Sequence, residues 1–107
     1  MLNKFLAELI GTFVFLGVII VCVAGESLTI AEKAETWIKV GLALSIAILL
    51  MGKVSGGHFN PAVSVMFYLN NGLTAEELII YILAQIIGAV LAFASYKFFY
   101  GHLKNHK

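Results

Sequence analysis

The chain has 107 residues, of which 61% are hydrophobic and 12% are charged, and its formal net charge is +1. A small soluble domain normally carries about twice that charged fraction, so the composition indicates a membrane protein and excludes an ordinary soluble domain. The low net charge argues against nucleic acid as a partner, and the length allows at most about three spans of 20 residues with short loops.

The first two apolar segments are predicted to cross the membrane as helices. One covers about residues 5–24, long enough for roughly 30 Å of hydrocarbon, and contains a single charged residue, Glu8. A cleavable signal peptide is the alternative, but signal cores are shorter and rarely contain an acidic residue, so the helix is expected to remain. Residues 25–36 are polar and predict an aqueous loop, with room for one interfacial helical turn, and the second span is expected at about residues 37–54.

A third span is predicted at about residues 75–100. Its start is marked by Thr74 and by Glu77 three residues later, a capping box that pairs the side chain of each residue with the backbone N–H of the other. The tail at residues 101–107 is polar and is expected to be frayed.

The segment between the second and third spans does not fit a simple loop. Residues 62–69 are apolar but would extend only about 12 Å as a helix, too short to span and too apolar for water. Asn60 is a favoured N-cap and Pro61 suits the first helical position, so a re-entrant or interfacial half-helix is expected over about residues 61–69. The predicted fold class is an all-α membrane protein with three transmembrane helices and one re-entrant half-helix.

The start of this half-helix is the candidate functional site. If it dips into the membrane, its N-terminus lies near the midplane, where irregular backbone is tolerated only inside protein or beside a water-filled cavity. Free N–H groups, the helix dipole and the Asn60 amide would bind neutral polar molecules and repel cations there. Gly56 and Gly57 would let the backbone fold tightly and place its carbonyls along a wall. The alternative is an interfacial helix with an ordinary cap and turn.

The string SGGHFNPAVSV at residues 55–65 resembles the first-half signature of the aquaporin and glycerol-facilitator family, the major intrinsic proteins. AELIGTF at residues 7–13 and YILAQIIGA at residues 81–89 are similar to the first and third helices of that family. The resemblance covers nearly the whole chain, but only the amino-terminal half of a family member, which holds two such halves in inverted orientation. It implies half of an aquaporin-like fold, in one domain over residues 1–107.

The resemblance also implies roles for individual residues. Glu8 and Gln85 match polar positions that brace the re-entrant loop, and intramembrane polar groups generally face the protein interior. For Glu8, which lies one turn into its helix, snorkelling to the membrane surface is the alternative. The residues expected to line a pore are Asn60, Pro61, Ala62, Gly56, Gly57, His58 and Val40.

The narrow filter of water-selective family members uses an aromatic residue on the second span and an arginine after the second Asn-Pro-Ala. This chain has Val40 and Val63 at the corresponding positions and contains no arginine. The filter cannot be built even from two copies, so the resemblance predicts a wider and less polar constriction than that of a strict water channel.

Three spans and one half-helix cannot enclose a pore, so at least two copies are expected to assemble, and antiparallel pairing would recreate an inverted repeat. The lysine count near span ends favours an outside N-terminus, whereas the resemblance places it inside, so dual topology is a hypothesis. Small residues four apart, Ala7 and Gly11 among them, fit close helix packing. The lysines on the N-terminal side are Lys4 and Lys53, and those on the other side are Lys33, Lys39, Lys97, Lys104 and Lys107.

The expected function is a passive channel for water or small neutral solutes such as glycerol, formed as a homo-oligomer in the lipid bilayer of a cell membrane. The alternatives are a non-conducting subunit that modifies full-length channels and a nonfunctional fragment, although the polar tail favours a finished small protein. An enzyme is not expected, because the sequence shows no nucleophile with a base, no paired carboxylates and no metal-ligand cluster. No cofactor is predicted.

Overall fold

The computed structural model describes residues 1–23 and 29–104, and the secondary structure within these ranges is entirely helical. Three long helices are apolar enough to cross a membrane, α4 through its part from Ala75 to Gly101. This confirms the predicted all-α membrane fold. The elements are α1 (Leu2–Val23), α2 (Ile30–Ser55), the half-length α3 (Pro61–Leu69) and α4 (Ala75–Lys104).

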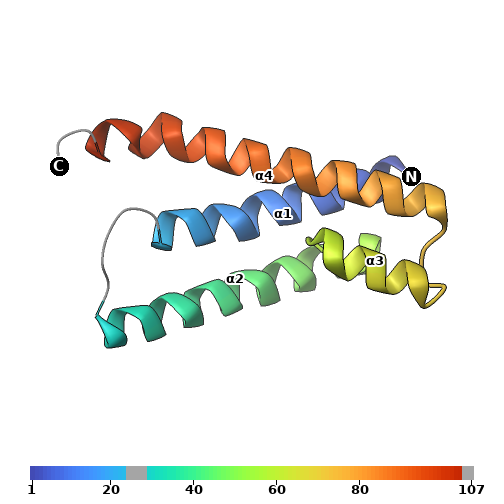
Figure 1. Cartoon of the computed structure of the whole chain (residues 1–107), viewed down its shortest axis with the longest axis horizontal. Coiled ribbons are helices and arrows are strands. Elements are labelled where there is room, and N and C mark those ends of the chain that lie inside the picture. Colours follow the sequence, from blue (N-terminus) through green and yellow to red (C-terminus); the bar gives the residue numbers. More distant parts are fainter. Residues whose placement is uncertain (24–28, 105–107) are drawn as a thin grey trace.

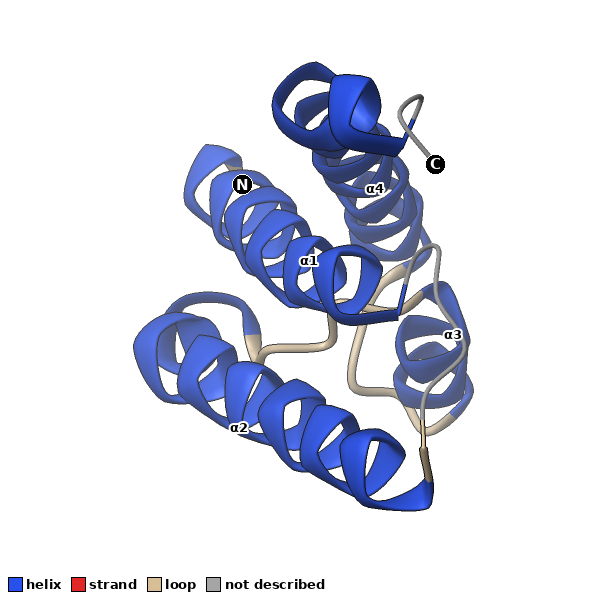
Figure 2. Ribbon diagram, turned by 90° about the vertical axis from the view of Figure 1, so that its left-hand side faces the viewer, coloured by secondary structure: helices blue, strands red, loops and turns tan. Residues whose placement is uncertain are grey.

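The helices form an open arc with α1 in its middle. α1 packs against both α2 and α4, and α3 packs against α4; the end-on view in Figure 2 shows α1 between its two neighbours. α1 and α4 run in the same direction and α2 runs in the opposite one (Figure 1). α3 begins in the interior of the bundle, away from both ends of the long axis, and ends near the end that holds the N-terminus (Figure 1). The half-helix therefore starts at mid-depth.

α2 begins at Ile30, so the prediction of an aqueous loop was wrong for residues 30–36, while residues 24–28 lie outside the described part of the chain. The reason is the N-cap at Thr29: its hydroxyl oxygen accepts a hydrogen bond from the backbone N–H of Glu32 (3.1 Å), and its hydroxyl donates to the Glu32 carboxylate (2.9 Å). The Ala, Glu and Lys residues that follow are strong helix formers, which outweighs their polarity.

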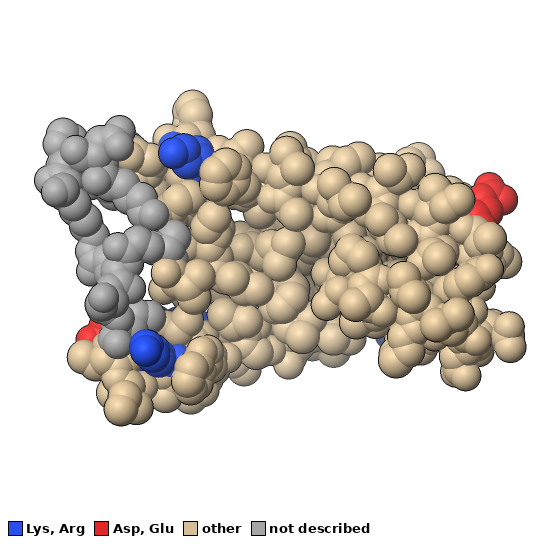
Figure 3. Space-filling view, in the orientation of Figure 1, with Lys and Arg blue, Asp and Glu red and all other residues tan. Residues whose placement is uncertain are grey.

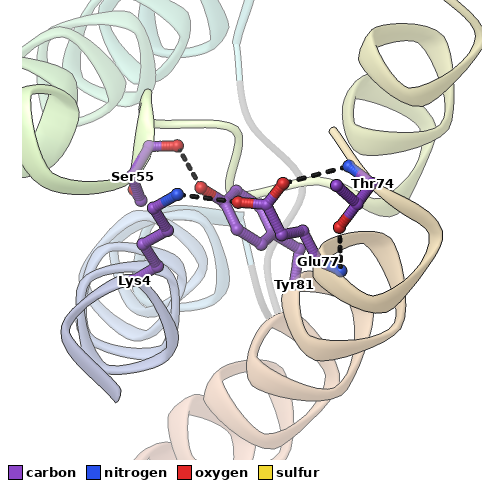
Figure 4. A network of polar contacts seen from close by, with 5 residues as sticks. All are labelled: Lys4, Ser55, Thr74, Glu77 and Tyr81. Atoms are coloured by element: carbon purple, nitrogen blue, oxygen red, sulfur yellow. Dashed lines mark hydrogen bonds and ion pairs between the residues drawn. The ribbon is translucent and has the colours of Figure 1, made fainter. Parts of the chain in front are cut away.

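α4 begins as predicted and ends later than predicted. The capping box is confirmed, since Thr74 N–H donates to Glu77 (3.0 Å) and Glu77 N–H donates to the Thr74 hydroxyl (3.1 Å). Lys4 of α1 pairs with the same carboxylate at 2.7 Å and ties the first turns of the two helices together (Figure 4). The helix continues to Lys104, so the expectation of a frayed tail was wrong for residues 101–104, and residues 105–107 are outside the described part.

Polar side chains form much of the interior, while large apolar side chains point outward. Glu8 and Ser64 have no exposed surface and Gln85 has 2%, whereas Leu49 and Phe98 are more than three-quarters exposed. In Figure 3, the charged groups lie mainly toward the two ends of the long axis and the middle is almost uncharged. Such a surface suits lipid and leaves the polar groups for an internal site.

Candidate functional site

The turn between α2 and α3 folds the chain back on itself through left-handed backbone. Gly56 and Gly57 have φ values of 92° and 68°, which glycine adopts without steric cost. Phe59 has φ 53°, although a side chain in this region costs roughly 1–2 kcal/mol. The turn is therefore held in a strained shape by contacts from outside it.

The carboxylate of Glu8 is the main contact. Its Oε2 accepts hydrogen bonds from the Ser55 hydroxyl (2.6 Å) and the backbone N–H of His58 (3.1 Å). Its Oε1 accepts from the backbone N–H of Phe59 (2.8 Å) and from Gln85 Nε2 (2.9 Å). One buried side chain thus joins α1, the turn and α4, and Glu8 does not snorkel to the surface.

These bonds also orient the backbone carbonyls of the turn. The N–H groups of His58 and Phe59 point to Glu8, and that of Gly57 points to the Ser55 hydroxyl (3.2 Å). In a trans peptide the N–H and the preceding carbonyl point in opposite directions, and the described residues contain no cis peptide. The carbonyls of Gly56, Gly57 and His58 therefore point away from Glu8 and Ser55. None of them accepts a hydrogen bond within the described part of the chain.

A second layer of polar contacts lies behind the turn: Gln85 was predicted as a brace, whereas Ser64 and Tyr81 were not anticipated from the sequence. Gln85 Nε2 donates to the Ser64 hydroxyl (2.9 Å), whose proton is then available for His58 Nδ1, also at 2.9 Å. Tyr81 donates its hydroxyl to the last carbonyl of α2, that of Ser55, at 2.6 Å (Figure 4). The available signal was the spacing of Tyr81 and Gln85, one turn apart on one face of an apolar helix.

The start of α3 is left open. As predicted, Asn60 is the N-cap and Pro61 the first helical residue: Asn60 Oδ1 accepts from the backbone N–H of Ala62 at 2.8 Å. That bond leaves the Asn60 NH₂ group with two free donors among the described residues. All three residues are exposed in the single chain, so polar groups face outward at mid-depth of an apolar molecule.

Val40 does not belong to this cluster. It precedes Gly56 by 16 positions on α2, which is about 24 Å along a helix axis, and its side chain is half-buried. The structure therefore brings together the predicted residues of the turn, the half-helix start and the two polar braces, and places Val40 toward the other end of the molecule.

Three spans and a half-helix whose polar N-terminus is clamped at mid-depth define an integral, multi-pass membrane protein with a re-entrant segment. The family model described as Major intrinsic protein matches residues 1–107. The chain belongs to the major intrinsic protein family, whose members are transport channels rather than enzymes.

Similar proteins include bacterial facilitators and aquaporins. The chain is 44% identical over 92% of its length to Glycerol uptake facilitator protein-like 6 of Lactiplantibacillus plantarum, 39% identical over 88% to Aquaporin Z of Photorhabdus laumondii, and 40% identical over 78% to Propanediol uptake facilitator PduF of Salmonella typhimurium. These matches cover 44%, 42% and 32% of the respective relatives, so the chain spans less than half of their length.

Proposed function

We propose that this chain forms a passive channel for water or small neutral solutes such as glycerol, as an assembly of two or more copies in the lipid bilayer of a cell membrane. The observation that carries the proposal is the row of unpaired carbonyls at Gly56, Gly57 and His58 beside the free amide donors of Asn60. Hydrocarbon cannot satisfy such groups, and water or a hydroxyl-bearing solute can.

In this proposal the pore wall combines acceptors with donors. A passing water would donate to the carbonyls of the turn and accept from the Asn60 amide. The partial positive charge of the helix start disfavours cations and protons. Glu8 and Gln85 act as braces of the turn, and the pore-lining set is Asn60, Pro61, Ala62, Gly56, Gly57, His58 and Val40.

Assembly is part of the proposal because the start of α3 is exposed in the single chain. In this proposal a second copy covers this polar end, since lipid-exposed irregular backbone does not occur in hydrocarbon. An antiparallel pair related by a two-fold axis in the membrane plane would bring two half-helices to the same depth, as in inverted-repeat transporters.

The proposed constriction is wide and weakly polar. In an assembly of copies of this chain, Val40 and Val63 would take the positions of the aromatic residue and the arginine that narrow a water-selective passage, and no arginine would line it. Glycerol is therefore expected to pass along with water. Two of the relatives named above, a glycerol and a propanediol facilitator, are consistent with this choice of solute class.

The test is stopped-flow light scattering of proteoliposomes that contain only this chain, challenged osmotically with an impermeant solute and, separately, with glycerol. Asn60→Asp keeps the oxygen that caps α3 and removes the NH₂ donors, so it should reduce permeability toward that of empty vesicles. The matched control is Asn71→Asp, the same change in the exposed turn after α3, which should conduct like the wild type. Shrinkage of wild-type vesicles at the rate of empty ones, with the protein folded and inserted, would reject the self-sufficient channel.

A further inference from the structure

Phe59 combines a backbone conformation that a bulky residue rarely adopts with nearly complete burial. Its φ is 53° and its exposed fraction is 2%. Its backbone N–H donates to Glu8 at 2.8 Å, and its ring lies against Gly11, one turn further along α1. Both attachments of this residue therefore come from one face of one helix.

The contact with Gly11 leaves no room for a side chain on the helix. A methyl group built on Gly11 would overlap three carbons of the Phe59 ring, Cδ1, Cε1 and Cζ. The ring cannot retreat alone, because it is buried and its backbone is hydrogen-bonded to Glu8. Any side chain at Gly11 would thus be accommodated by movement of the turn.

We propose that Gly11 is a positioning residue of the channel. The Phe59 ring packs against the bare backbone of Gly11, and this contact, the Gly11 seat, holds the turn in the strained shape that presents Asn60. A left-handed residue with a side chain persists only when its surroundings over-determine it. The Glu8 hydrogen bond fixes the backbone of Phe59 and the Gly11 seat fixes its ring. This inference rests on the proposed channel function.

Without the seat, Phe59 relaxes toward negative φ, and the rotation is transmitted first to Asn60, the next residue. The hydrogen bonds from the turn to Glu8 are lost in the same movement, since the N–H of Phe59 makes one of them. Gly11 was expected from its spacing to pack one helix against another. In the structure it receives the turn instead, and Gly88 makes the close helix contact, toward the backbone of α1.

The experiment compares Gly11→Ala with Gly17→Ala, the same substitution on the same helix at a position where the added methyl meets nothing within 4 Å. Two readouts are taken in proteoliposomes: osmotic water permeability, and hydrogen–deuterium exchange of the amides at residues 57–59. Gly11→Ala is expected to lower permeability and to speed this exchange by about tenfold or more, as for local loss of hydrogen bonding. Gly17→Ala is expected to match the wild type in both.

A third variant separates positioning from general damage. Phe59→Leu in the Gly11→Ala background shortens the side chain so that it ends before Cε1 and Cζ, and it should restore part of both the permeability and the exchange protection. Equal behaviour of Gly11→Ala and Gly17→Ala, or absence of any rescue, would overturn the inference. If the wild type itself does not conduct, the proposed function fails, and the exchange comparison alone still decides whether Gly11 seats the turn.

Discussion

The carboxylate of Glu8 is satisfied by hydrogen-bond donors rather than by a cation. The ion pairs among the described residues are Lys4 with Glu77 and Lys39 with Glu35, both near the ends of helices. Glu8 instead accepts four hydrogen bonds, two of them from backbone N–H groups of the turn. A carboxylate offers hydrogen-bond acceptors and no donor, so it matches a set of four donors.

Glu8→Gln should therefore weaken the turn although the shape of the side chain is kept. The amide replaces one of the two carboxylate oxygens by an NH₂ group. At that position the NH₂ donors would face the donors that the oxygen accepts from in the wild type. An unsatisfied buried group costs about 1–3 kcal/mol, and more than one partner is affected. We expect a loss of about 2–4 kcal/mol, measured as a lower midpoint of thermal unfolding in detergent.

The control for this change is Glu76→Gln, an exposed glutamate in the first turn of α4. It removes the same charge without a hydrogen-bond network and should shift the unfolding midpoint little. A Glu8→Gln protein as stable as the Glu76→Gln protein would mean that the hydrogen bonds of Glu8 add nothing to the stability of the fold beyond the packing of its side chain.

At the scale of the elements, α4 comes close to the backbone of α1 at Gly88. A methyl group there would lie 2.6 Å from the backbone oxygen of Leu9 and 3.0 Å from Thr12 Cβ. Backbone atoms cannot rotate aside as a side chain can, so the two helices would have to separate. Because Gln85 lies one turn earlier on the same helix, separation would also draw it away from Glu8.

Gly88→Ala is accordingly expected to destabilise the fold by about 1–3 kcal/mol, the usual cost of overpacking. Gly101→Ala serves as the matched control on α4, since a methyl group there meets nothing within 4 Å. Chemical denaturation in mixed micelles gives both values. If the two variants unfolded at the same denaturant concentration, the close contact at Gly88 would carry no energetic weight.

The elements show which parts of this fold are encoded locally. The cap at Asn60 and Pro61 and the box at Thr74 and Glu77 depend on neighbours in sequence, and both were predicted from the residues alone. The start of α2 lies earlier than predicted, because residues 30–36 are polar although Thr29 caps a helix there. The partners Ser64 and Phe59 could not be predicted, because they meet Gln85 and Gly11 only through tertiary contacts.

At the scale of the whole molecule, the arc is open on one side. Within the described residues, α2 packs against α1 and against no other helix, and α3 packs only against α4. The long helices carry apolar side chains on most of their outer surface, so lipid can cover them, but it cannot cover the start of α3. The proposed antiparallel assembly closes this side, and it requires that copies insert in both orientations.

Dual insertion predicts that a tag at either terminus is accessible from both faces of the membrane. Tags at the N-terminus and the C-terminus, each assayed in sealed and in permeabilised cells, should each be partly labelled before permeabilisation. Lys97→Gln and Lys33→Gln remove two of the five lysines on the far side of the membrane from the N-terminus. The double change should raise the fraction of copies whose N-terminus is inside. Labelling of a given tag from one face alone would exclude antiparallel pairs.

The separation of Glu8 from its last partner along the chain sets a condition for biosynthesis. Gln85 follows Glu8 by 77 residues, so ribosomes adding about 5–20 residues per second deliver it roughly 4–15 s later. An ionised carboxylate is costly in hydrocarbon for all of that time. The first helix must therefore stay in contact with water or with the insertion machinery until the third long helix has emerged. The three spans would then enter the membrane as a single unit.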